Sequence, residues 1–343
     1  MSVSAQILAG EEGISASVEI LRRGGVVGLP TETVYGLAGD AFNPIAVAEI
    51  FEAKGRPLSD PLIVHLPDAG WLDRVALVTS KEQRQMVDQL AAAFWPGPMT
   101  ILLPKHPDLP DLVTAGSDLV AVRVTSHPLF QEVLRRLGRP LAAPSANRFG
   151  RISPTSAKDV QIELGLKISL ILDGGACEHG MESTLVSLEG SPEKLTFCIL
   201  RPGPITKDQL LQFGHVNVSE RIVNSPGSLP GHYAPKKRLH IMDSDMKPIP
   251  EGAKVGLLAF STSFQEKHQG YAALEVLSPS IDLKEAAANF YGALRRLDQS
   301  NVDLIVAQPL PEEGLGVAIM DRLRRASHGS IHGTGHQASD STI

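Results

Sequence analysis

The sequence predicts an α/β protein in which a twisted, open, mixed sheet with helices forms a large domain and a smaller α/β domain follows it. Short apolar runs alternate with helical patterns, and Gly and Pro separate them through the first 235 residues. The alternation resumes after a Pro-rich break. A chain of 343 residues, 43% of them hydrophobic, can bury two cores at roughly 150 residues per domain.

In the first part of the chain, apolar runs of three to five residues are short enough for buried strands, and longer amphipathic stretches favour helices. The predicted strands are residues 26–29, 62–66, 100–103, 120–124, 141–143, 169–173 and 184–188. The predicted helices are residues 14–23, 46–51, 81–94, 129–136 and 157–164. These segments are sufficient for one open sheet.

The Pro-rich break at residues 224–235 can be neither a helix nor an interior strand, because Pro cannot donate a backbone hydrogen bond. Beyond it, strands at 255–260, 273–277 and 304–307 and helices at 283–297 and 317–325 predict a small Rossmann-like α/β domain. The predicted boundaries are residues 1–215 for the first domain, 216–238 for a linker, 239–327 for the second domain and 328–343 for a disordered tail, which is almost devoid of apolar residues.

Charge and cysteine content restrict the function classes. The formal net charge of −6 does not favour a polyanion, so a contact with RNA would need a local basic patch. Cys177 and Cys198 can supply neither a four-thiolate zinc site nor a disulfide framework, which predicts a cytoplasmic protein. The apolar runs are far shorter than the roughly 20 residues that span a bilayer, and the first residues lack a secretory pattern, so no membrane association is expected.

The common catalytic templates are missing from the sequence: a P-loop, a strand-linked GxGxxG, HExxH and GxSxG do not occur. Instead, polar clusters follow predicted strands, where α/β sheets bind ligands. The first surrounds Thr31, Glu32 and Thr33. Thr31 and Glu32 could form a simple helix cap, or Thr33 could offer its hydroxyl to a small polar ligand.

Two further clusters carry cations. Lys54 and Arg56 flank a glycine and suit phosphate oxygens, although a solvated basic loop is the alternative. His65, in the next strand, is more typical of a core histidine. Arg123 lies inside an apolar strand and needs an anion there. That anion could be Glu32 or Asp173 in a structural salt bridge, or a substrate carboxylate.

The remaining clusters combine small polar residues with turns. Residues 142–147 and 150–155 leave room for a ligand beside the backbone, but Ser153 before Pro154 is also a plain helix start. Residues 173–175, 182–184 and 201–203 could each be only a turn. Their occurrence together in one domain favours a binding site.

At these residues the sequence resembles the YrdC-like family, specifically its long form, the L-threonylcarbamoyladenylate synthases. The motifs stand in family order: PTETVYGL at 30–37, KGRP at 54–57, FWPGPMT at 94–100, PSAN at 144–147 and EST at 182–184. SPG at 225–227, HYAP at 232–235 and GLGVAIMDRL at 314–323 are typical of the long form. The resemblance implies a YrdC-like fold with a large concave pocket.

The resemblance also implies a reaction. L-threonine, bicarbonate or CO2, and ATP give threonylcarbamoyl-AMP and pyrophosphate, and other proteins transfer the threonylcarbamoyl group to position 37 of tRNAs that read ANN codons. In the family's chemistry, the threonine amine is carboxylated and the carbamate attacks the α-phosphate, so no enzyme nucleophile is needed. Magnesium is expected with ATP, and its protein ligands are not named by the sequence.

Family motifs assign roles to residues of this chain. The residues expected to bind L-threonine are Thr33, His65, Arg123, Ala143 and Ser183, with Arg123 on the carboxylate. The residues expected to bind ATP are Lys54, Arg56, Asp60, Ser145, Asn147, Ser153, Arg201, His232 and Tyr233. Lys54, Arg56 and Arg123 are the predicted catalytic residues.

The linker is expected to fold over the pocket as a lid, closing His232 or Tyr233 on the nucleotide. Two departures from the family pattern stand out. The linker lacks basic residues before His232, and Asp60 replaces a common Asn, so its carboxylate would repel a triphosphate unless it faces magnesium or Lys54.

Two other functions compete. The YrdC-like module of hydrogenase-maturation carbamoyltransferases makes a related adenylate, but its Cys-rich zinc motifs do not occur here. An RNA-binding or regulatory module without adenylating activity is the alternative from another class, since family members can bind RNA weakly on a basic concave face. A downstream threonylcarbamoyl transferase complex is the expected protein partner.

Overall fold

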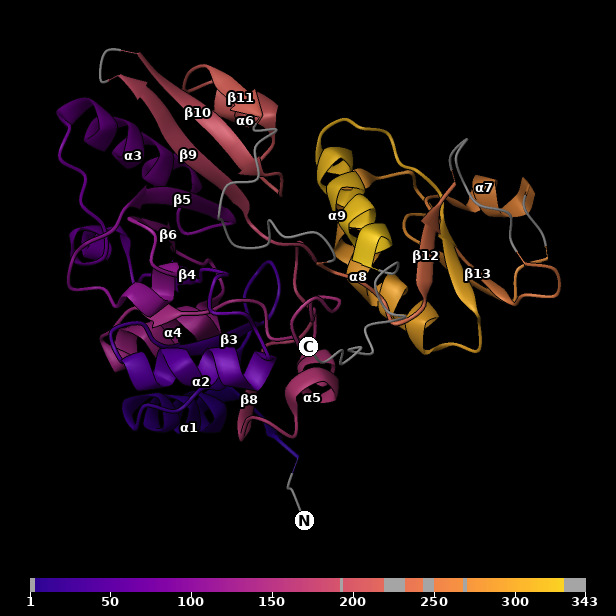
Figure 1. The fold of residues 1–343 in the computed structure, drawn as a ribbon, viewed down its shortest axis with the longest axis horizontal. Coiled ribbons are helices and arrows are strands. Elements are labelled where there is room, and N and C mark those ends of the chain that lie inside the picture. Colours follow the sequence, from indigo (N-terminus) through magenta and orange to yellow (C-terminus); the bar gives the residue numbers. More distant parts are fainter. Residues whose placement is uncertain (1–3, 192–193, 219–231, 243–249, 268–269, 330–343) are drawn as a thin grey trace, which may run out of the picture.

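The computed structural model describes residues 4–191, 194–218, 232–242, 250–267 and 270–329. An 11-stranded sheet and a 4-stranded sheet form two lobes, a larger one from the first part of the chain and a smaller one from its C-terminal part (Figure 1). The predicted α/β class with a mixed sheet and a second, smaller α/β domain is therefore confirmed.

The elements of the larger domain follow the predicted alternation of strands and helices. They are β1 (Gln6–Ala9), α1 (Gly10–Arg22), β2 (Val27–Leu29), β3 (Gly36–Asp40), α2 (Pro44–Lys54), β4 (Ile63–His65), the 3-10 helix η1 (Ala69–Arg74), α3 (Lys81–Phe94), β5 (Met99–Pro104), η2 (Asp111–Thr114), β6 (Leu119–Arg123), α4 (Pro128–Leu137), β7 (Leu141–Ala142), α5 (Ala157–Leu164), β8 (Leu170–Asp173), β9 (Thr184–Ser191), β10 (Lys194–Arg201), α6 (Lys207–Leu211) and β11 (Val216–Val218).

The large sheet is mixed, with the strand order β1-β8-β2-β3-β7-β4-β6-β5-β9-β10-β11. On one face, α1 and α4 bury Val18, Leu21, Phe130 and Leu134 against strand residues such as Leu29. Helices α2, α3 and α5 contribute to a separate core cluster with the sheet. The sheet is thus covered by helices, and its strand ends carry the loops that form the site.

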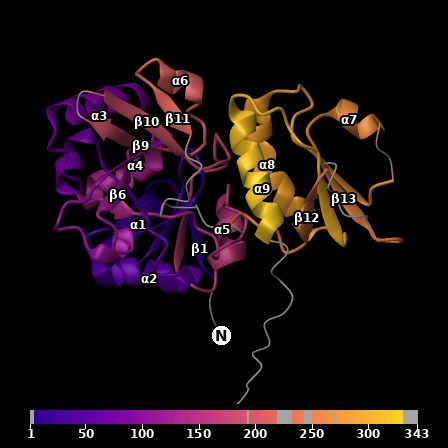
Figure 2. The same cartoon turned by 45° about the horizontal axis from the view of Figure 1, so that its top comes forward.

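The C-terminal domain is a parallel sheet with helices packed on it. Its elements are β12 (Arg238–Ile241), β13 (Val255–Ala259), α7 (Thr262–Lys267), β14 (Ala273–Val276), α8 (Leu283–Gln299), β15 (Leu304–Ala307) and α9 (Leu315–Gly329). The strand order is β12-β15-β13-β14, and neighbouring strands in this order pair in parallel. Helices α8 and α9 lie between this sheet and the larger domain (Figure 2).

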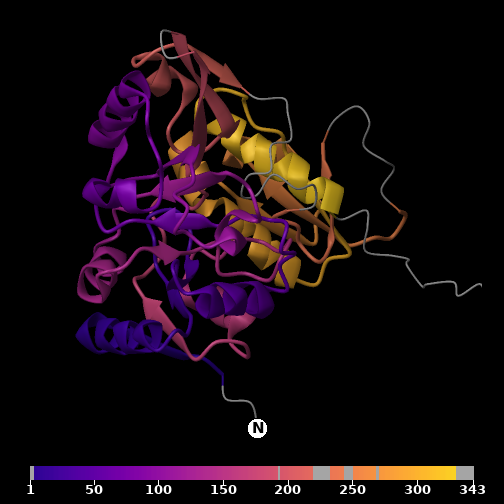
Figure 3. The same cartoon turned by 60° about the vertical axis from the view of Figure 1, so that its left-hand side comes forward.

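One apolar cluster joins the two domains. Phe290 and Tyr291 of α8 pack in the same buried cluster as Val34, Ile152 and Met181 of the larger domain. With the larger domain in front, the yellow α9 and the orange strands lie directly behind it (Figure 3). The second domain therefore shares a core with the residues that flank the candidate site.

Several elements differ from the prediction. The strands β1, β3, β10, β11 and β12 were not predicted. Strand β3 contains Gly39, where a Cβ would lie 3.2 Å from Ile50 Cδ1, so this small residue allows α2 to approach the sheet.

The predicted domain boundaries can be placed on these elements. Strand β11 pairs with β10, so the large sheet continues to Val218 past the predicted boundary at residue 215. Helix α9 runs to Gly329, so the first two residues of the predicted tail are helical. Residues 330–343 and most of the predicted linker, residues 219–231, lie outside the described part of the chain. Within the described part, no helix has the length and apolar character needed to cross a bilayer.

Candidate active site

Two adjacent parallel strands bring His65 and Arg123 to the same edge of the sheet. They end β4 and β6, and the strand register pairs them directly. The carboxyl ends of neighbouring parallel strands are where α/β sheets bind ligands. Both side chains are buried, and the His65 ring stacks on Phe130 at 4.9 Å between centroids.

Arg123 is held by the segment between β2 and β3. Its Nη2 lies 2.7 Å from Glu32 Oε1, its Nη1 donates to Thr33 Oγ1 at 2.9 Å, and its Nε donates to the carbonyl of Gly97 at 3.1 Å. Of the two structural partners considered from the sequence, Glu32 is therefore the one present. Asp173 instead lies near the hydroxyl of Tyr35.

The charge on Glu32 follows from this pairing. Burial by itself raises the pKa of Glu32, but the charge of Arg123 and hydrogen bonds from Thr125, Arg123 and the Ser126 amide lower it to about 2. The helix cap considered for Thr31 is absent, because Thr31 Oγ1 donates to the carbonyl of Val34 in a turn before β3. The segment therefore lies against Arg123 and orients its guanidinium through Glu32 and Thr33.

Lys54 and Arg56 are placed by the end of α2. Gly55 caps this helix in the left-handed conformation, with a φ of 60° that favours glycine. Lys54 Nζ donates to the carbonyls of Asn147, at 2.5 Å, and Ser145. Arg56 Nη2 pairs with Asp60 Oδ1 at 2.8 Å. Both cations are buried, so the alternative of a solvated basic loop is wrong.

Burial disfavours the charged forms of both Lys54 and Arg56. It lowers the pKa of Lys54 well below its usual range, with the charge of Arg56 acting in the same direction. Asp60 faces Arg56 and also His232, whose Nε2 lies 3.6 Å from Asp60 Oδ2. The carboxylate that the sequence analysis flagged as repulsive is thus neutralised by Arg56 rather than by Lys54.

A second buried cluster of polar side chains surrounds Ser183 and Glu182. Arg201, at the end of β10, donates from Nε to the Ser183 carbonyl at 3.1 Å and from Nη2 to Ser183 Oγ at 3.0 Å. Thr100 Oγ1 lies 2.6 Å from the same hydroxyl. Ser153 donates from Oγ to Glu182 Oε1 at 2.6 Å. Ser183 and Glu182 are adjacent in sequence, so the two contacts position one segment.

The described end of the linker lies in this site. His232 contacts the edge of Phe149 at 5.0 Å between ring centroids, and Tyr233 has a φ of 69°, which is strained for a residue other than glycine. Packing offsets this strain, because Arg322 lies 5.4 Å from the Tyr233 ring centroid and Tyr291 lies at 5.8 Å. Both linker residues, rather than one of them, therefore line the site.

These segments line a partly open cavity. Its lining contains most of the predicted threonine-binding and ATP-binding residues. The lining residues are Thr31, Thr33, Val34, Gly36, Arg56, Ile63, His65, Arg123, Ala143, Pro144, Ser145, Glu182, Ser183, Arg201, His232 and Tyr233. The structure thus brings together residues that are up to 202 positions apart in the sequence, from Thr31 to Tyr233.

Four predicted ATP-binding residues do not line the cavity. Lys54 and Asp60 lie behind the lining residues Ser145 and Arg56. Asn147 donates from its amide to the carbonyls of Arg148, at 2.8 Å, and Arg151, at 2.9 Å, and Ser153 contacts Glu182. Their direct contact with ATP stays a prediction.

The sequence analysis did not assign a role to Glu182 or to any residue of the C-terminal domain. Glu182 lines the cavity and accepts hydrogen bonds from Tyr291 at 2.8 Å and Arg322 at 3.1 Å. The EST motif contained this glutamate, but the sequence carries no signal that pairs it with residues more than 100 positions away. Among the described residues, no cluster of three or more His, Cys, Asp or Glu could hold a metal ion.

The fold and cavity define an α/β protein with a candidate small-molecule site, whose lining includes the buried cations Arg56, Arg123 and Arg201. Residues 19–203 match the family model described as "Telomere recombination", and residues 205–328 match "Threonylcarbamoyl-AMP synthase, C-terminal domain". The chain belongs to the threonylcarbamoyl-AMP synthase family, which confirms the resemblance seen in the sequence.

Relatives of similar length support this membership. The threonylcarbamoyl-AMP synthase of Bacillus subtilis is 38% identical, covering 96% of this chain and 97% of the relative. That of Pyrococcus abyssi is 36% identical over 92% of this chain and 94% of the relative. The crystal structure of P. abyssi Sua5 complexed with L-threonine superimposes with a TM-score of 0.84 at 33% identity, covering 95% and 98% of the two chains.

The two buried histidines of the site make the fold sensitive to acid. Burial lowers the pKa of both His65 and His232 from 6.5 to about 3. Between pH 6.5 and 3 the unfolded chain binds protons that the folded chain does not, so stability falls as the pH falls. Each histidine should lower the free energy of unfolding by about 1.4 kcal/mol from pH 7.5 to pH 5.5.

Urea unfolding of the wild type and His232→Asn at pH 7.5 and 5.5 checks this expectation. The variant should lose less stability on acidification, by about 1.4 kcal/mol. Equal losses in the two proteins would show that His232 is protonated in the folded chain. His106, which is partly exposed and distant from the cavity lining, supplies the control substitution His106→Asn.

Proposed function

We propose that this chain synthesises L-threonylcarbamoyl-AMP from L-threonine, bicarbonate or CO2, and ATP, with release of pyrophosphate. One observation carries the proposal beyond family membership. A single cavity has Arg123, Arg56 and Arg201 in its lining, so it offers cations to both a carboxylate and a polyphosphate.

The reaction depends on the correct positions of its reactants and needs no nucleophile from the enzyme. The threonine amine takes up CO2 to form a carbamate, whose oxygen attacks the α-phosphate of ATP while the bond to pyrophosphate breaks. Holding the reactants in line and neutralising phosphate charge supply most of the rate enhancement in such a transfer. In our proposal, Arg56 and Arg201 bind phosphate oxygens. Lys54 keeps Ser145 in place beside them by donating to the carbonyls of Ser145 and Asn147.

Arg123 can hold Glu32 and a substrate carboxylate at the same time. A guanidinium has five N–H donors, and the contacts to Gly97 and Thr33 use one donor each, while Glu32 lies against Nη2. Donors on both terminal nitrogens are therefore left for a ligand. Glu32 orients the guanidinium, and we propose that the threonine carboxylate completes its coordination.

Magnesium is proposed to enter with the triphosphate. The described residues hold no cluster of three or more acidic, His or Cys side chains, and magnesium commonly binds through substrate phosphates and water. When bound, the ion would neutralise charge on the β- and γ-phosphates. Asp60 is already paired with Arg56, which makes it a weak candidate for a ligand.

The product is a reactive mixed anhydride, so a transferase must accept it soon after release. We propose a downstream threonylcarbamoyl transferase complex acting on tRNA, and a cytoplasmic location, in agreement with the two cysteines of the chain. Weak contact with RNA stays a prediction, because the net charge of −6 offers no general attraction to it.

Pyrophosphate release by the purified chain with ATP, magnesium and bicarbonate tests the function. L-threonine should support release, with threonylcarbamoyl-AMP detected by mass spectrometry. L-serine, which lacks one methyl group, should be poorer by about 10- to 200-fold in kcat/KM, and L-valine, which lacks the hydroxyl, poorer still. A folded chain that releases no pyrophosphate with any amino acid would instead favour an RNA-binding or regulatory role.

A further inference from the structure

We propose that Arg295 of the C-terminal domain is a positioning residue for the nucleotide half of the cavity, acting through the segment that carries Ser153. This inference rests on the proposed function. It assigns the second domain a direct part in the geometry of ATP binding, beyond the contact that the linker residues His232 and Tyr233 make with the cavity.

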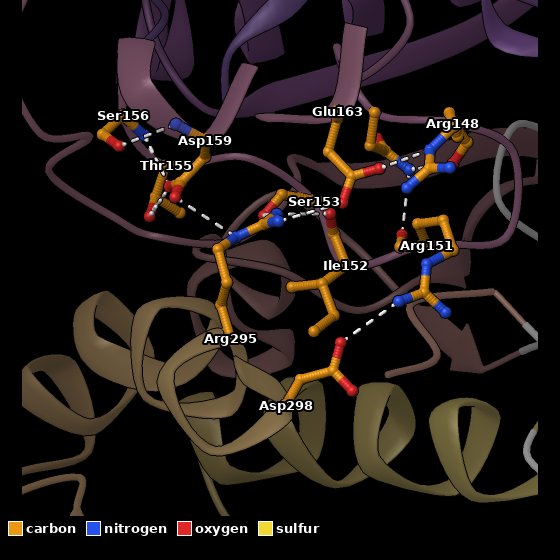
Figure 4. Close-up of polar contacts among 11 residues, drawn as sticks. Arg148, Arg151, Ile152, Ser153, Thr155, Ser156, Asp159, Glu163, Arg295 and Asp298 are labelled. Carbon is orange, nitrogen blue, oxygen red and sulfur yellow. Dashed lines mark hydrogen bonds and ion pairs between the residues drawn. The ribbon is translucent and has the colours of Figure 1, made fainter. Parts of the chain in front are cut away.

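Arg295 reaches from α8 into the larger domain, and the residue is 6% exposed (Figure 4). Nη1 donates to Glu163 Oε1 at 3.0 Å and Nε lies 3.2 Å from Asp159 Oδ1, so both carboxylates belong to α5. Nη2 donates to the carbonyl of Ile152 at 2.8 Å, and the carbonyl of Ser153 lies at 3.4 Å. One side chain thus joins α5 to the segment before it.

The side chain of Ser153 is held from the same domain by another route. Its hydroxyl donates to Glu182 Oε1, and Glu182 accepts from Tyr291 of α8 and from Arg322 of α9. Glu182, Tyr291 and Arg322 are all buried. The charge of Arg322 and that of Arg201 lower the pKa of Glu182 against the effect of burial, which keeps it an acceptor.

Ser153 is therefore fixed at its backbone by Arg295 and at its hydroxyl by Glu182. The same segment adjoins Asn147, whose amide donates to the carbonyl of Arg151 at 2.9 Å, and Asn147 follows the cavity residues Pro144 and Ser145. A shift of about 1 Å in a group that positions a substrate can lower the rate by up to 100-fold. Removal of Arg295 should therefore raise the KM for ATP through this chain of contacts.

The threonine half of the cavity has different supports. Arg123 is held by Glu32, Thr33 and Gly97, all in the larger domain. Arg295 instead contacts Ile152, Ser153 and the two carboxylates of α5. A positioning role for Arg295 therefore predicts an effect on ATP and little effect on L-threonine, whereas general loss of stability would affect both substrates.

The neighbouring Arg296 provides a matched control on the same helix. It pairs with Glu275 at 2.7 Å within the C-terminal domain, and its side chain is 59% exposed. Arg295→Met and Arg296→Met remove the same charge from adjacent positions. Arg295→Lys keeps the charge beside Glu163 but cannot contact all of the partners at once, so it should restore part of the activity.

The test measures kcat and both KM values for the full-length wild type and the three variants. Arg295→Met should raise the KM for ATP by at least about tenfold, while the KM for L-threonine changes less than twofold. Hydrogen exchange of residues 150–156 should also become faster in Arg295→Met than in Arg296→Met. A KM for ATP and an exchange rate equal to those of Arg296→Met would overturn the proposal.

Unfolding of the variant and inactivity of the wild type can each be told apart from a failed role of Arg295. If Arg295→Met unfolds because Glu163 keeps only its ion pair with Arg148, the double variant Arg295→Met with Glu163→Gln removes that buried charge and is measured instead. A wild-type chain that releases no pyrophosphate contradicts the proposed function, and the exchange of residues 150–156 then decides whether Arg295 holds this segment. A fully active wild type with unaffected variants contradicts only the role of Arg295.

Discussion

Replacing Arg123 by Met is expected to lower kcat/KM for L-threonine by about 100-fold, with a much smaller change in the KM for ATP. The substitution removes the guanidinium proposed to bind the substrate carboxylate. It also leaves Glu32 buried without its cation, 2.7 Å from where Nη2 was, which should destabilise the fold by about 3–5 kcal/mol.

A second variant separates these two effects. Combining Arg123→Met with Glu32→Gln neutralises the orphaned carboxylate, so it should recover stability in urea unfolding without recovering L-threonine binding. Isothermal titration of L-threonine into both folded variants provides the direct measurement. If binding returned together with stability, Arg123 would be a scaffold residue and the threonine carboxylate would lie elsewhere.

Replacing Lys54 by Met is expected to lower kcat/KM for ATP by roughly 100-fold, the effect typical of losing one preorganised group in an active site. Lys54 is 3% exposed and donates to the carbonyls of Ser145 and Asn147. Its loss leaves these carbonyls unpaired and frees the segment that places Ser145 in the cavity lining. Steady-state kinetics with varied ATP and saturating L-threonine measures the effect.

Lys105 offers the matched control for this substitution. Its Nζ also donates to a backbone carbonyl, that of Leu109 at 3.0 Å, and pairs with Asp111, but it does not line the cavity. Lys105→Met should therefore change stability slightly and leave both KM values unchanged. Equal kinetic losses in Lys54→Met and Lys105→Met would show that Lys54 acts only through general stability.

The alternation of apolar runs and helical patterns was sufficient to predict the class and the helices α1, α2, α3, α4, α5, α8 and α9. Strand β3 was missed. Gly39 stands where α2 packs on this strand, so the local sequence loses its strand signal to a tertiary contact.

In the candidate site, too, the sequence identified some features and only the structure identified others. Motifs in the chain identified Arg123, Lys54 and Arg56, because each cation stands in an apolar or Gly/Pro-rich context where it needs an anion. They left open which anion Arg123 binds. The structure selects Glu32, since the segment after β2 passes over the end of β6 and Asp173 does not reach it.

By itself, the sequence determined the fold class, the family and the types of side chain available to the cavity, because these depend on composition, periodicity and short motifs. Only the tertiary structure decided that Glu182 accepts hydrogen bonds from Tyr291 and Arg322, and that Arg295 donates to the carbonyls of Ile152 and Ser153. These contacts join residues 109 to 143 positions apart. Such pairings follow from how the two domains dock, which no local pattern encodes.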